Sequence, residues 1–397
     1  MSVVKTFVSH HGGDYQNRVL PLLRRVAPLG VRPWRDRDEI DGGASLGDAL
    51  RQGILGDACR SLCVFLTHES TKRPWVDYEV REALERARRE RFAVIPIALD
   101  PVKEVKAQEL PPGLDELLNL DERKWLDPAH ADFAEQLARA VLGAAGVCDA
   151  GELVLHLGHR VSSADALVPE GWRELPTLDL RAELRGADDY SPSEAAWGEI
   201  EQGLRTLKAI LPELRRLHVC GRAPLALGAM VGKIWDRASG VQIDAANHQS
   251  AQMWATEFAD DAQMRNVTPG SVRQVRFTGP SDGSKPSLLV AFLPAGKPHY
   301  LPAVRDLKAR LPGAPPLCLV ETPALIADAA QAREVLVECV GLLHFLRNGF
   351  RGTIELVSGL PLALQVLLGH HLRQLGTLRL HDQVLPDGGY RLAMTIT

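Results

Sequence analysis

Residues 61–99 read SLCVFLTHESTKRPWVDYEVREALERARRERFAVIPIAL, and this stretch decides the fold class of the first part of the chain. Its ends, 61–68 and 92–99, are short apolar runs without polar alternation, which is typical of strands buried on both faces. The segment 74–90 between them carries apolar residues at helical spacing: Val76, Val80, Leu84 and Ala87. Pro74 lies close to the first turn, where proline is favoured. This order of strand, helix and strand predicts a parallel sheet covered by helices.

The rest of the first 145 residues continues this alternation. We expect two more strands at 5–10 (KTFVSH) and 31–34 (VRPW). Helical patterns occupy three further stretches: 15–29, 45–55 and 130–143. The small-residue segment 143–151 then predicts a short linker. We therefore predict an α/β domain over 1–145 and a second region over 152–397.

Length and composition limit the class of protein. A chain of 397 residues exceeds one ordinary hydrophobic core, so two or three domains are expected. A formal net charge of -4 argues against general binding of DNA or RNA, which needs excess Lys and Arg. The six cysteines form no CxxC pair, so we expect buried thiols rather than disulfides or a zinc site. No apolar stretch reaches a membrane span or a signal peptide, which predicts a cytoplasmic protein that does not bind membranes.

The second region contains an internal repeat. LHVCGRAPLALGAMVGKIWDRASGVQID at 217–244 recurs as IELVSGLPLALQVLLGHHLRQLGTLRLH at 354–381. Pro224 aligns with Pro361 and Gly232 with Gly369, and both offsets are 137 (361−224 and 369−232). Each copy predicts strand, tight turn, helix and strand, which is half of a nucleotide-binding α/β unit. Two copies indicate a pair of similar lobes with a ligand crevice at strand carboxyl ends.

Three segments of the first domain resemble a TIR domain. KTFVSHHGGD at 5–14 is similar to its first strand, and VRPWRDRDEIDGGASLGDALRQGI at 31–54 resembles its second strand and BB loop. FLTHESTKRPWVDYEV at 65–80 ends in the pattern W-x-x-x-E, here Trp75 to Glu79. The resemblance implies a flavodoxin-like fold and makes Glu79 the catalytic carboxylate of NAD cleavage. Helix geometry alone would favour a solvated Glu79 at the helix edge.

The chemistry is compatible with one carboxylate. Nicotinamide in NAD is a cationic leaving group that departs neutral, so the acid that most glycosidases need is not required. One anionic acceptor can stabilise the oxocarbenium-like ribose. Trp34 and Trp75 are either walls of the site or packing residues. The resemblance and the strand ends predict these substrate-binding residues: Phe7, Ser9, His10, Trp34, Arg35, Asp38 and Trp75.

The repeated region resembles the SAVED domain, which is built of two CARF-like (Rossmann-like) α/β units and senses cyclic oligonucleotides. The segments that carry this resemblance are ELVLHLGHR at 152–160, the first copy of the repeat, and the stretch from 352 to the end. The turns GRAP (221–224) and SGLP (358–361) precede helices, whose N-termini favour anions. Arg222 adds a charge that the second turn, with Leu360, lacks. The expected ligand contacts are Gly221, Arg222, Lys297, Tyr300, Ser358, Gly359 and Leu360. A simpler explanation of the two turns is that tight packing of strand against helix requires small residues. A simpler explanation of residues 297–300 is that they form an exposed loop without a ligand.

A TIR domain followed by a SAVED domain resembles the TIR-SAVED effectors of CBASS anti-phage systems. The resemblance implies that a cyclic tri- or tetranucleotide binds the second region and that chains then assemble head to tail into a filament. Apposed TIR domains would cleave NAD, which is substrate rather than cofactor; no metal or other cofactor is expected. One alternative is a non-enzymatic TIR scaffold. Another is a second region that binds a protein or a different small ligand.

Overall fold

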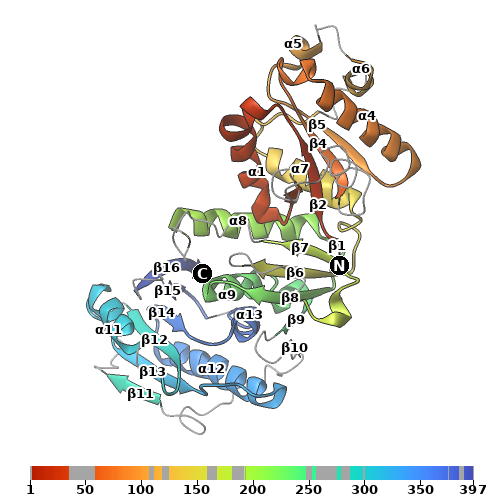
Figure 1. The fold of residues 1–397 in the computed structure, drawn as a ribbon. Coiled ribbons are helices and arrows are strands. Elements are labelled where there is room, and N and C mark those ends of the chain that lie inside the picture. Colours follow the sequence, from red (N-terminus) through yellow and green to blue (C-terminus); the bar gives the residue numbers. More distant parts are fainter. Residues whose placement is uncertain are drawn as a thin grey trace. The chain divides into compact units, whose positions relative to one another are not determined.

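The computed structural model describes most of the chain (Figure 1). The described residues are 2–34, 59–106, 111–118, 125–158, 168–180, 192, 194–246, 253–255, 275–278, 287–297, 300–373, 375–383 and 389–396. Two compact units emerge from the internal contacts. The first comprises 1–153, 173–183 and 205–214, and the second comprises 154–172, 184–204 and 215–397.

A four-stranded sheet forms the centre of the first unit. Its strand order is β3-β2-β4-β5, and every neighbouring pair is parallel. The strands are β2 (Lys5–Ser9), β3 (Arg32–Trp34), β4 (Cys59–Leu66) and β5 (Ala93–Ala98). This is the order 2-1-3-4 with which a flavodoxin-like sheet begins. The parallel sheet predicted from the apolar runs is confirmed, and all four strands end at the same edge.

Strand β4 begins and ends two residues before the predicted range. Thr67 leaves the ladder because its backbone N–H donates to Ser70 Oγ over 2.8 Å, while its own Oγ1 accepts from the Ser70 N–H over 3.0 Å. This pair of side-chain hydrogen bonds forms a local turn that competes with strand structure. The turn starts the loop that leads to the long helix α4.

Helices cover both faces of this sheet (Figure 1). Helix α4 (Pro74–Arg89) lies on one face, while α1 (Leu20–Val26) and α7 (Phe133–Ala144) lie on the other. Two short helices follow β5: α5 (Val102–Lys106) and α6 (Pro112–Leu118). Short turns of other helix types are η1 (Gly12–Asp14), η2 (Tyr15–Val19), η3 (Ala27–Leu29) and η4 (Ser70–Lys72). The helices predicted at 15–29, 74–90 and 130–143 are therefore present, and 45–55 lies outside the described residues.

The core of the first unit follows the predicted helical stripe. Val76 and Val80 are fully buried, Leu84 is buried and Ala87 is partly buried. They pack with apolar side chains of β2, β3 and β4, including Phe7 and Trp34. Burial of several such side chains, each contributing about 1.5–3 kcal/mol, holds α4 against the sheet.

Two further sheets each contain six described strands. The first has the order β1-β7-β6-β8-β9-β10, and the second has the order β11-β13-β12-β14-β15-β16. Strands of the first are β1 (Ser2–Val3), β6 (Glu152–Gly158), β7 (Pro176–Asp179), β8 (Arg216–Arg222), β9 (Gln242–Ala246) and β10 (Met253–Ala255). Strands of the second are β11 (Val275–Thr278), β12 (Ser287–Pro294), β13 (Leu317–Thr322), β14 (Thr353–Ser358), β15 (Leu378–Gln383) and β16 (Tyr390–Ile396).

The two sheets repeat one topology. β7-β6-β8-β9-β10 has the same order along the chain as β13-β12-β14-β15-β16. In each, a parallel pair (β8–β9 or β14–β15) is followed by an antiparallel last strand. The edge position that β11 takes in one sheet is taken in the other by β1, which pairs with β7 through Val3 and Thr177.

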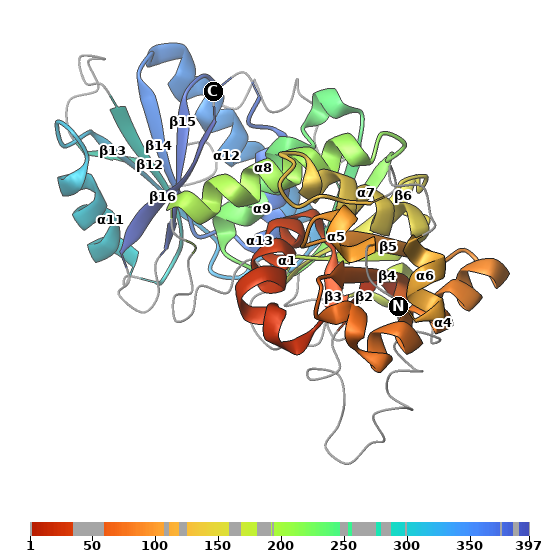
Figure 2. The same cartoon turned by 90° about the horizontal axis from the view of Figure 1, so that it is seen from above.

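The repeat predicted from the sequence corresponds to these strand–helix–strand units. Helix α9 (Leu225–Ile234) connects β8 to β9, and α13 (Leu362–His370) connects β14 to β15. Proline precedes both helices, since Pro224 and Pro361 occupy the N-cap with nearly equal backbone angles. The other helical elements are α8 (Glu194–Ile210), α11 (Tyr300–Arg310), α12 (Ala329–Gly349), η7 (Glu170–Trp172) and η9 (Arg237–Ser239). We call the sheet β11-β13-β12-β14-β15-β16 and its helices the second lobe. In this lobe, α11 and α12 lie on opposite faces of the sheet (Figure 2).

Cysteine burial agrees with the expectation of free thiols. Cys59, Cys63, Cys220, Cys318 and Cys339 are buried and Cys148 is partly buried, and all six are unbridged. Burial raises the pKa of the Cys63 thiol to about 12, although a hydrogen bond with Thr6 acts in the opposite direction. None of the helices in the described part of the chain has the length and apolar character of a membrane span. Within the same ranges, no three metal-ligating side chains gather into a site.

Candidate functional site

Helix α4 places Glu79 at the boundary of the core. Val76 and Val80 anchor the helix to the sheet, and Glu79 lies next to them in the sequence. Only 6% of Glu79 is exposed, so the solvated position that helix geometry alone favoured is not the observed one. Trp75, one turn before Glu79, is 45% exposed. The W-x-x-x-E pattern therefore combines a buried carboxylate with an exposed indole.

Strand β2 brings Ser9 and His10 to the carboxyl edge of the sheet. Ser9 is 1% exposed, and its hydroxyl has no hydrogen-bond partner among the described residues. The His10 ring is half-buried; its Nδ1 lies 3.3 Å from the Val8 carbonyl oxygen, and its centroid lies 4.9 Å from that of Tyr15. Both side chains thus end the first strand where open α/β sheets bind ligands.

Trp34 and Phe7 belong to the interior. Their rings stack with centroids 4.9 Å apart and an interplanar angle of 22°, and both are buried. This geometry is that of a packing pair, which is the second of the two interpretations of Trp34 given by the sequence. Arg35 and Asp38 lie outside the described residues.

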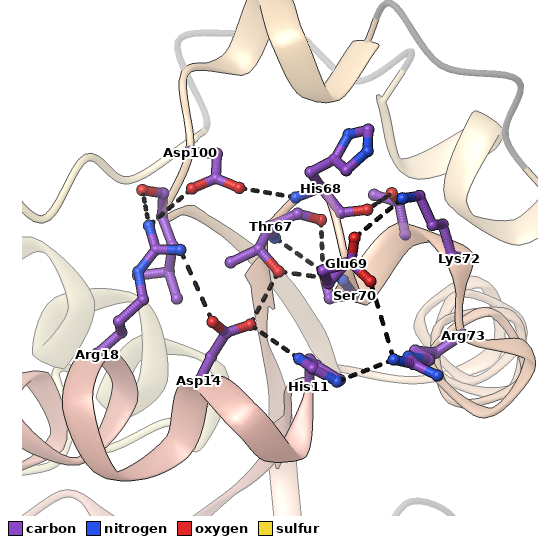
Figure 3. Close-up of polar contacts among 12 residues, drawn as sticks. His11, Asp14, Arg18, Thr67, His68, Glu69, Ser70, Lys72, Arg73 and Asp100 are labelled. Carbon is purple, nitrogen blue, oxygen red and sulfur yellow. Dashed lines mark hydrogen bonds and ion pairs between the residues drawn. The ribbon is translucent and has the colours of Figure 1, made fainter.

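Asp14 organises a polar network above the sheet edge (Figure 3). Its Oδ2 accepts a hydrogen bond from Thr67 Oγ1 over 2.9 Å and lies 3.4 Å from His11 Nδ1. Its Oδ1 lies 3.7 Å from Arg18 Nη1. One carboxylate in η1 therefore ties the end of β4 to the loop that follows β2.

Arg18 continues this network to the end of β5. Its Nη2 donates to Asp100 Oδ1 over 2.8 Å and to the Leu99 carbonyl oxygen. Asp100 Oδ2 accepts from the His68 backbone N–H over 2.7 Å. Burial alone would raise the pKa of Asp100, but the hydrogen bonds from His68 and Arg18 hold it below its usual value. Asp100 is therefore an anion that fixes the ends of β4 and β5 relative to each other.

Arg73 links the network to α4. Its Nη2 lies 3.1 Å from His11 Nε2 and 3.9 Å from Glu69 Oε2. Its guanidinium carbon lies 5.6 Å from the centroid of the Trp75 indole, within cation–π range. Arg73 is also the N-cap residue of the helix that carries Glu79. Charged residues near the predicted site thus converge on the start of α4.

This network was not predicted from the sequence. Each of its residues has at least one partner that is distant in the sequence: Thr67 for Asp14, Asp100 for Arg18 and His11 for Arg73. Local signals existed in two places: Asp14 follows the first strand, and Asp100 follows the run 92–99, so both mark strand carboxyl ends.

The turn at 221–224 requires glycine at its first position. Gly221 has φ +119°, and a Cβ there would lie 2.1 Å from the Leu157 carbonyl oxygen. Tight approach of β8 to β6 thus accounts for this residue, whose role as a ligand contact remains a prediction. Arg222 ends β8.

The remaining predicted ligand residues meet at one edge of the second lobe. Lys297 is exposed in the loop after β12, and Tyr300 begins α11. Ser358 is the last residue of the neighbouring parallel strand β14, and Gly359 follows it; a Cβ on Gly359 would lie 2.8 Å from Pro294 Cδ. The Gly359 N–H already donates to the Phe292 carbonyl oxygen over 2.7 Å, and Leu360 is 1% exposed. Of this set, Lys297 is exposed, whereas Tyr300 and Ser358 are partly buried, and Ser358 Oγ accepts a hydrogen bond from the Leu360 N–H over 3.4 Å.

Asp382 was not among the site residues predicted from the sequence. From β15 its Oδ1 accepts a hydrogen bond from the backbone N–H of Ala226, in the first turn of α9, over 3.4 Å. Asp382 is 5% exposed and lies near Tyr390, whose pKa is raised by burial and by the neighbouring Tyr300 and Asp382. A carboxylate of the second lobe thus occupies the helix N-terminus at which the sequence predicted a phosphate.

Comparison with known proteins shows what the two parts of the chain are similar to. Residues 6–141 match the family model of the TIR domain. Of the solved structures, the Acinetobacter baumannii Cap4 SAVED/CARF-domain containing receptor with the cyclic trinucleotide 2'3'3'-cAAA is 15% identical, with a TM-score of 0.45, covering 99% of this chain and 80% of that chain. The Moraxella osloensis Cap4 SAVED/CARF-domain containing receptor is 13% identical, with a TM-score of 0.44 and the same coverage.

A third structure matches the first domain alone. The TIR domain of the Toll-related receptor TRR-2 from Hydra magnipapillata is 16% identical with a TM-score of 0.27, covering 34% of this chain and 96% of that chain. None of the curated proteins matches the chain. The family match spans the four-stranded parallel sheet and the helix that carries Glu79. The similarity of this chain to the TIR domain family therefore covers residues 6–141.

Proposed function

We propose that this chain is a ligand-activated effector that cleaves NAD. The TIR domain performs the cleavage with Glu79 as the catalytic carboxylate, and the region 152–397 is a SAVED-type sensor of a cyclic oligonucleotide. Binding of the ligand favours a head-to-tail assembly in which the TIR domains become active. The products are nicotinamide and ADP-ribose, and the consequence in an infected cell is loss of NAD.

The burial of Glu79 is the observation that carries the enzymatic part. Glu is among the residues that are rarely buried, because a carboxylate loses hydration when it leaves water. Glu79 is nevertheless 6% exposed on a helix whose other buried positions are mostly apolar. Such a carboxylate can stabilise positive charge at the ribose more strongly than a solvated one, because the local dielectric is low.

Two other predicted site residues have groups that fit the same chemistry. Trp75 offers an exposed indole one turn from Glu79, and an indole can stack on a nicotinamide or adenine ring. Ser9 offers a buried hydroxyl, unpartnered among the described residues, at the end of β2. A hydroxyl in this position can bind a ribose hydroxyl or an amide of the substrate.

The repeated topology supports a sensor with two similar lobes. β8–α9–β9 and β14–α13–β15 are the same unit used twice, and each helix begins directly after a turn at a strand carboxyl end. A cyclic oligonucleotide presents the same phosphate and ribose groups repeatedly around its ring. Two similar lobes can therefore bind two equivalent parts of such a ligand.

Activation requires a difference in affinity between two states. The ligand must bind the assembled form more tightly than the single chain, since equal affinity would shift nothing. An interface between unlike surfaces that does not close on itself produces filaments. If NAD cleavage depends on assembly, the enzyme is inactive until the ligand is present.

A coupled assay tests the proposal. Purified full-length chain is mixed with NAD and a panel of cyclic di-, tri- and tetranucleotides, beginning with cAAA, while nicotinamide release and particle size are measured together. We expect one ligand to raise both signals. Failure of every ligand to bind would remove the sensor assignment.

Matched variants separate an enzyme from a scaffold. Glu79→Gln should lower the rate of nicotinamide release by about a hundredfold or more, while ligand-dependent assembly persists. Glu85→Gln, on the exposed side of the same helix, is the control and should retain activity. Ligand-stimulated cleavage that survives in Glu79→Gln would exclude Glu79 as the catalytic group. Assembly without any cleavage by the unmodified chain would favour the non-enzymatic TIR scaffold.

A further inference from the structure

The exposed indole of Trp75 is held by a charged neighbour. The Arg73 guanidinium lies 5.6 Å from the centroid of the ring, and Trp75 is 45% exposed. A guanidinium over an aromatic face binds through the ring quadrupole and restricts the rotation of the ring. Arg73 therefore limits the positions that Trp75 can adopt on the surface of α4.

Arg73 is in turn held by a histidine in a defined tautomer. Its Nη2 lies 3.1 Å from His11 Nε2. Arginine can only donate hydrogen bonds, so Nε2 must be the accepting, unprotonated nitrogen of a neutral ring. The proton of that ring then lies on Nδ1, which faces Asp14 Oδ2 at 3.4 Å. Asp14, His11 and Arg73 form a chain of contacts with one direction of donation (Figure 3). The Arg73 guanidinium extends this chain to the Trp75 ring.

Two neighbouring residues help to hold this histidine and its partner Asp14 in place. A Cβ on residue 13 would lie 3.0 Å from His11 Cε1, so the glycine at this position leaves room for the ring. Asp14 is itself bound by Thr67, which lies at the end of β4. The chain of contacts thus rests on the rigid carboxyl edge of the sheet.

We propose that Arg73, held by neutral His11, is a positioning residue that keeps Trp75 in place to stack on one ring of the dinucleotide substrate. The proposal rests on the NAD-cleaving function proposed above and assigns a new role within it. Arg73 acts through Trp75 and touches no reacting atom. Its effect is expected on substrate binding more than on the bond-breaking step.

A pH dependence follows from the tautomer. Protonation of His11 would place an N–H on Nε2, facing the Arg73 donor, with two positive groups 3.1 Å apart. The charged groups that face His11 are Asp14 in η1 and Arg73 before α4; Arg18 and Glu69 lie one contact further away. Protonated His11 would keep Asp14 and release Arg73, so Trp75 loses its support at low pH.

Kinetics of the ligand-activated full-length chain test the proposal. Arg73→Met should raise the KM for NAD roughly fivefold and leave kcat within about twofold. The KM of Arg73→Lys should lie between that of the unmodified chain and that of Arg73→Met, because Lys keeps the positive charge but lacks the planar guanidinium. Arg81→Met is the control on the same helix, since Arg81 pairs with Asp77 at 3.0 Å, and its KM should not change.

A pH profile distinguishes positioning from a merely structural role. In the unmodified chain KM should be higher in acid than at neutral pH, while in His11→Gln, whose carbonyl can accept from Arg73 at every pH, KM should not change with pH. An unchanged KM in Arg73→Met, or the same acid rise in His11→Gln, would overturn the proposal.

A measurement without catalysis separates this proposal from the proposed function. Acrylamide quenching of each protein, minus that of its Trp75→Phe counterpart, reports the accessibility of Trp75. Arg73→Met should increase this accessibility, and acid should increase it in the unmodified chain but not in His11→Gln. If the chain cleaves no NAD but these changes occur, the enzymatic function is wrong and the contact chain stands. If they do not occur, the positioning role is wrong whatever the activity.

Discussion

Gly232 and Gly369 each lie against the backbone of the other's helix. A Cβ on Gly232 of α9 would lie 1.9 Å from the Val366 carbonyl oxygen, and a Cβ on Gly369 of α13 would lie 2.1 Å from the Ala229 carbonyl oxygen. The two glycines occupy equivalent positions of the repeat, 137 residues apart (369−232). The reciprocal contact makes the helix pair the pseudo-symmetric centre of the two lobes.

Alanine at either position should destabilise the second region. Because the obstacle is backbone rather than a flexible side chain, the helices must separate to admit a methyl group, and we expect a loss of about 2–4 kcal/mol in the free energy of unfolding. Gly198→Ala in α8 is the matched control, since its added Cβ would meet no atom within 4 Å. Calorimetry checks both changes. An unaltered transition temperature in Gly232→Ala would contradict the close approach of the helices.

A buried histidine should make the second region sensitive to acid. His371 is 5% exposed, and both ring nitrogens lack a hydrogen-bond partner among the described residues. Burial, with further effects of His370, Arg237 and His344, lowers the pKa of His371 to about 3. The unfolded chain, with an ordinary pKa near 6.5, binds a proton that the folded chain does not. The stabilising effect of neutral His371 is therefore complete above about pH 6.5 and is lost as the pH falls toward 3.

His371→Leu should flatten that dependence. Between about pH 7 and pH 5 the unmodified chain should lose about 2 kcal/mol of stability from this residue, and the variant should not. His130→Gln, which changes an exposed histidine in the first domain, should leave the pH dependence of the second region intact. Denaturant unfolding at the two pH values provides the measurement. Equal pH slopes for His371→Leu and the unmodified chain would refute the assignment.

The sequence predicted those parts of the fold that have a local signature. The unalternating runs around 61–68 and 92–99 identified buried parallel strands, and the spacing of Val76 and Val80 identified the buried face of α4. The duplicated segment predicted two strand–helix–strand units, whereas the close contact between its two helices at Gly232 and Gly369 was not predicted. These strands and this helix are visible in the sequence because burial leaves a local pattern: a continuous apolar run where a strand is buried on both faces, and a period of 3.6 where a helix is buried on one face.

Long-range polar contacts were not predictable in this way. Ser2–Val3 is too short to show alternation, and its parallel pairing with β7 depends on a strand far along the chain. The contact of Asp14 with Thr67 and that of Asp382 with Ala226 likewise connect segments whose proximity only the tertiary fold creates. A carboxylate in a sequence carries no local sign of the donor that it will meet.

The ion pair of Arg32 with Asp179 should contribute to the stability of the first unit. Arg32 Nη1 lies 3.2 Å from Asp179 Oδ2, and the Asp179 side chain is fully buried. Arg32→Met would leave that carboxylate with less compensation, and we expect a loss of about 1–3 kcal/mol. The double variant Arg32→Met/Asp179→Asn should recover part of the loss, since it also removes the buried charge. A double-mutant cycle by calorimetry checks the coupling, and simple additivity of the two changes would contradict it.

Asp382 provides the sharpest prediction for the sensor. Its carboxylate accepts from the Ala226 N–H at the start of α9, directly after the turn at which a ligand phosphate is proposed to bind. Two anions cannot share one helix N-terminus without repulsion, so the phosphate must displace the carboxylate or bind against it. Asp382→Asn keeps an oxygen acceptor and removes the charge. We therefore expect this variant to bind the activating cyclic oligonucleotide on the order of tenfold more tightly, with only a small loss of stability.

Asp306→Asn, in an exposed position on α11, is the charge-matched control. Equilibrium titration at fixed ionic strength measures the affinities. If Asp382→Asn binds the ligand no more tightly than the control, the carboxylate is a structural helix cap, and the phosphate must bind at another place on the two lobes.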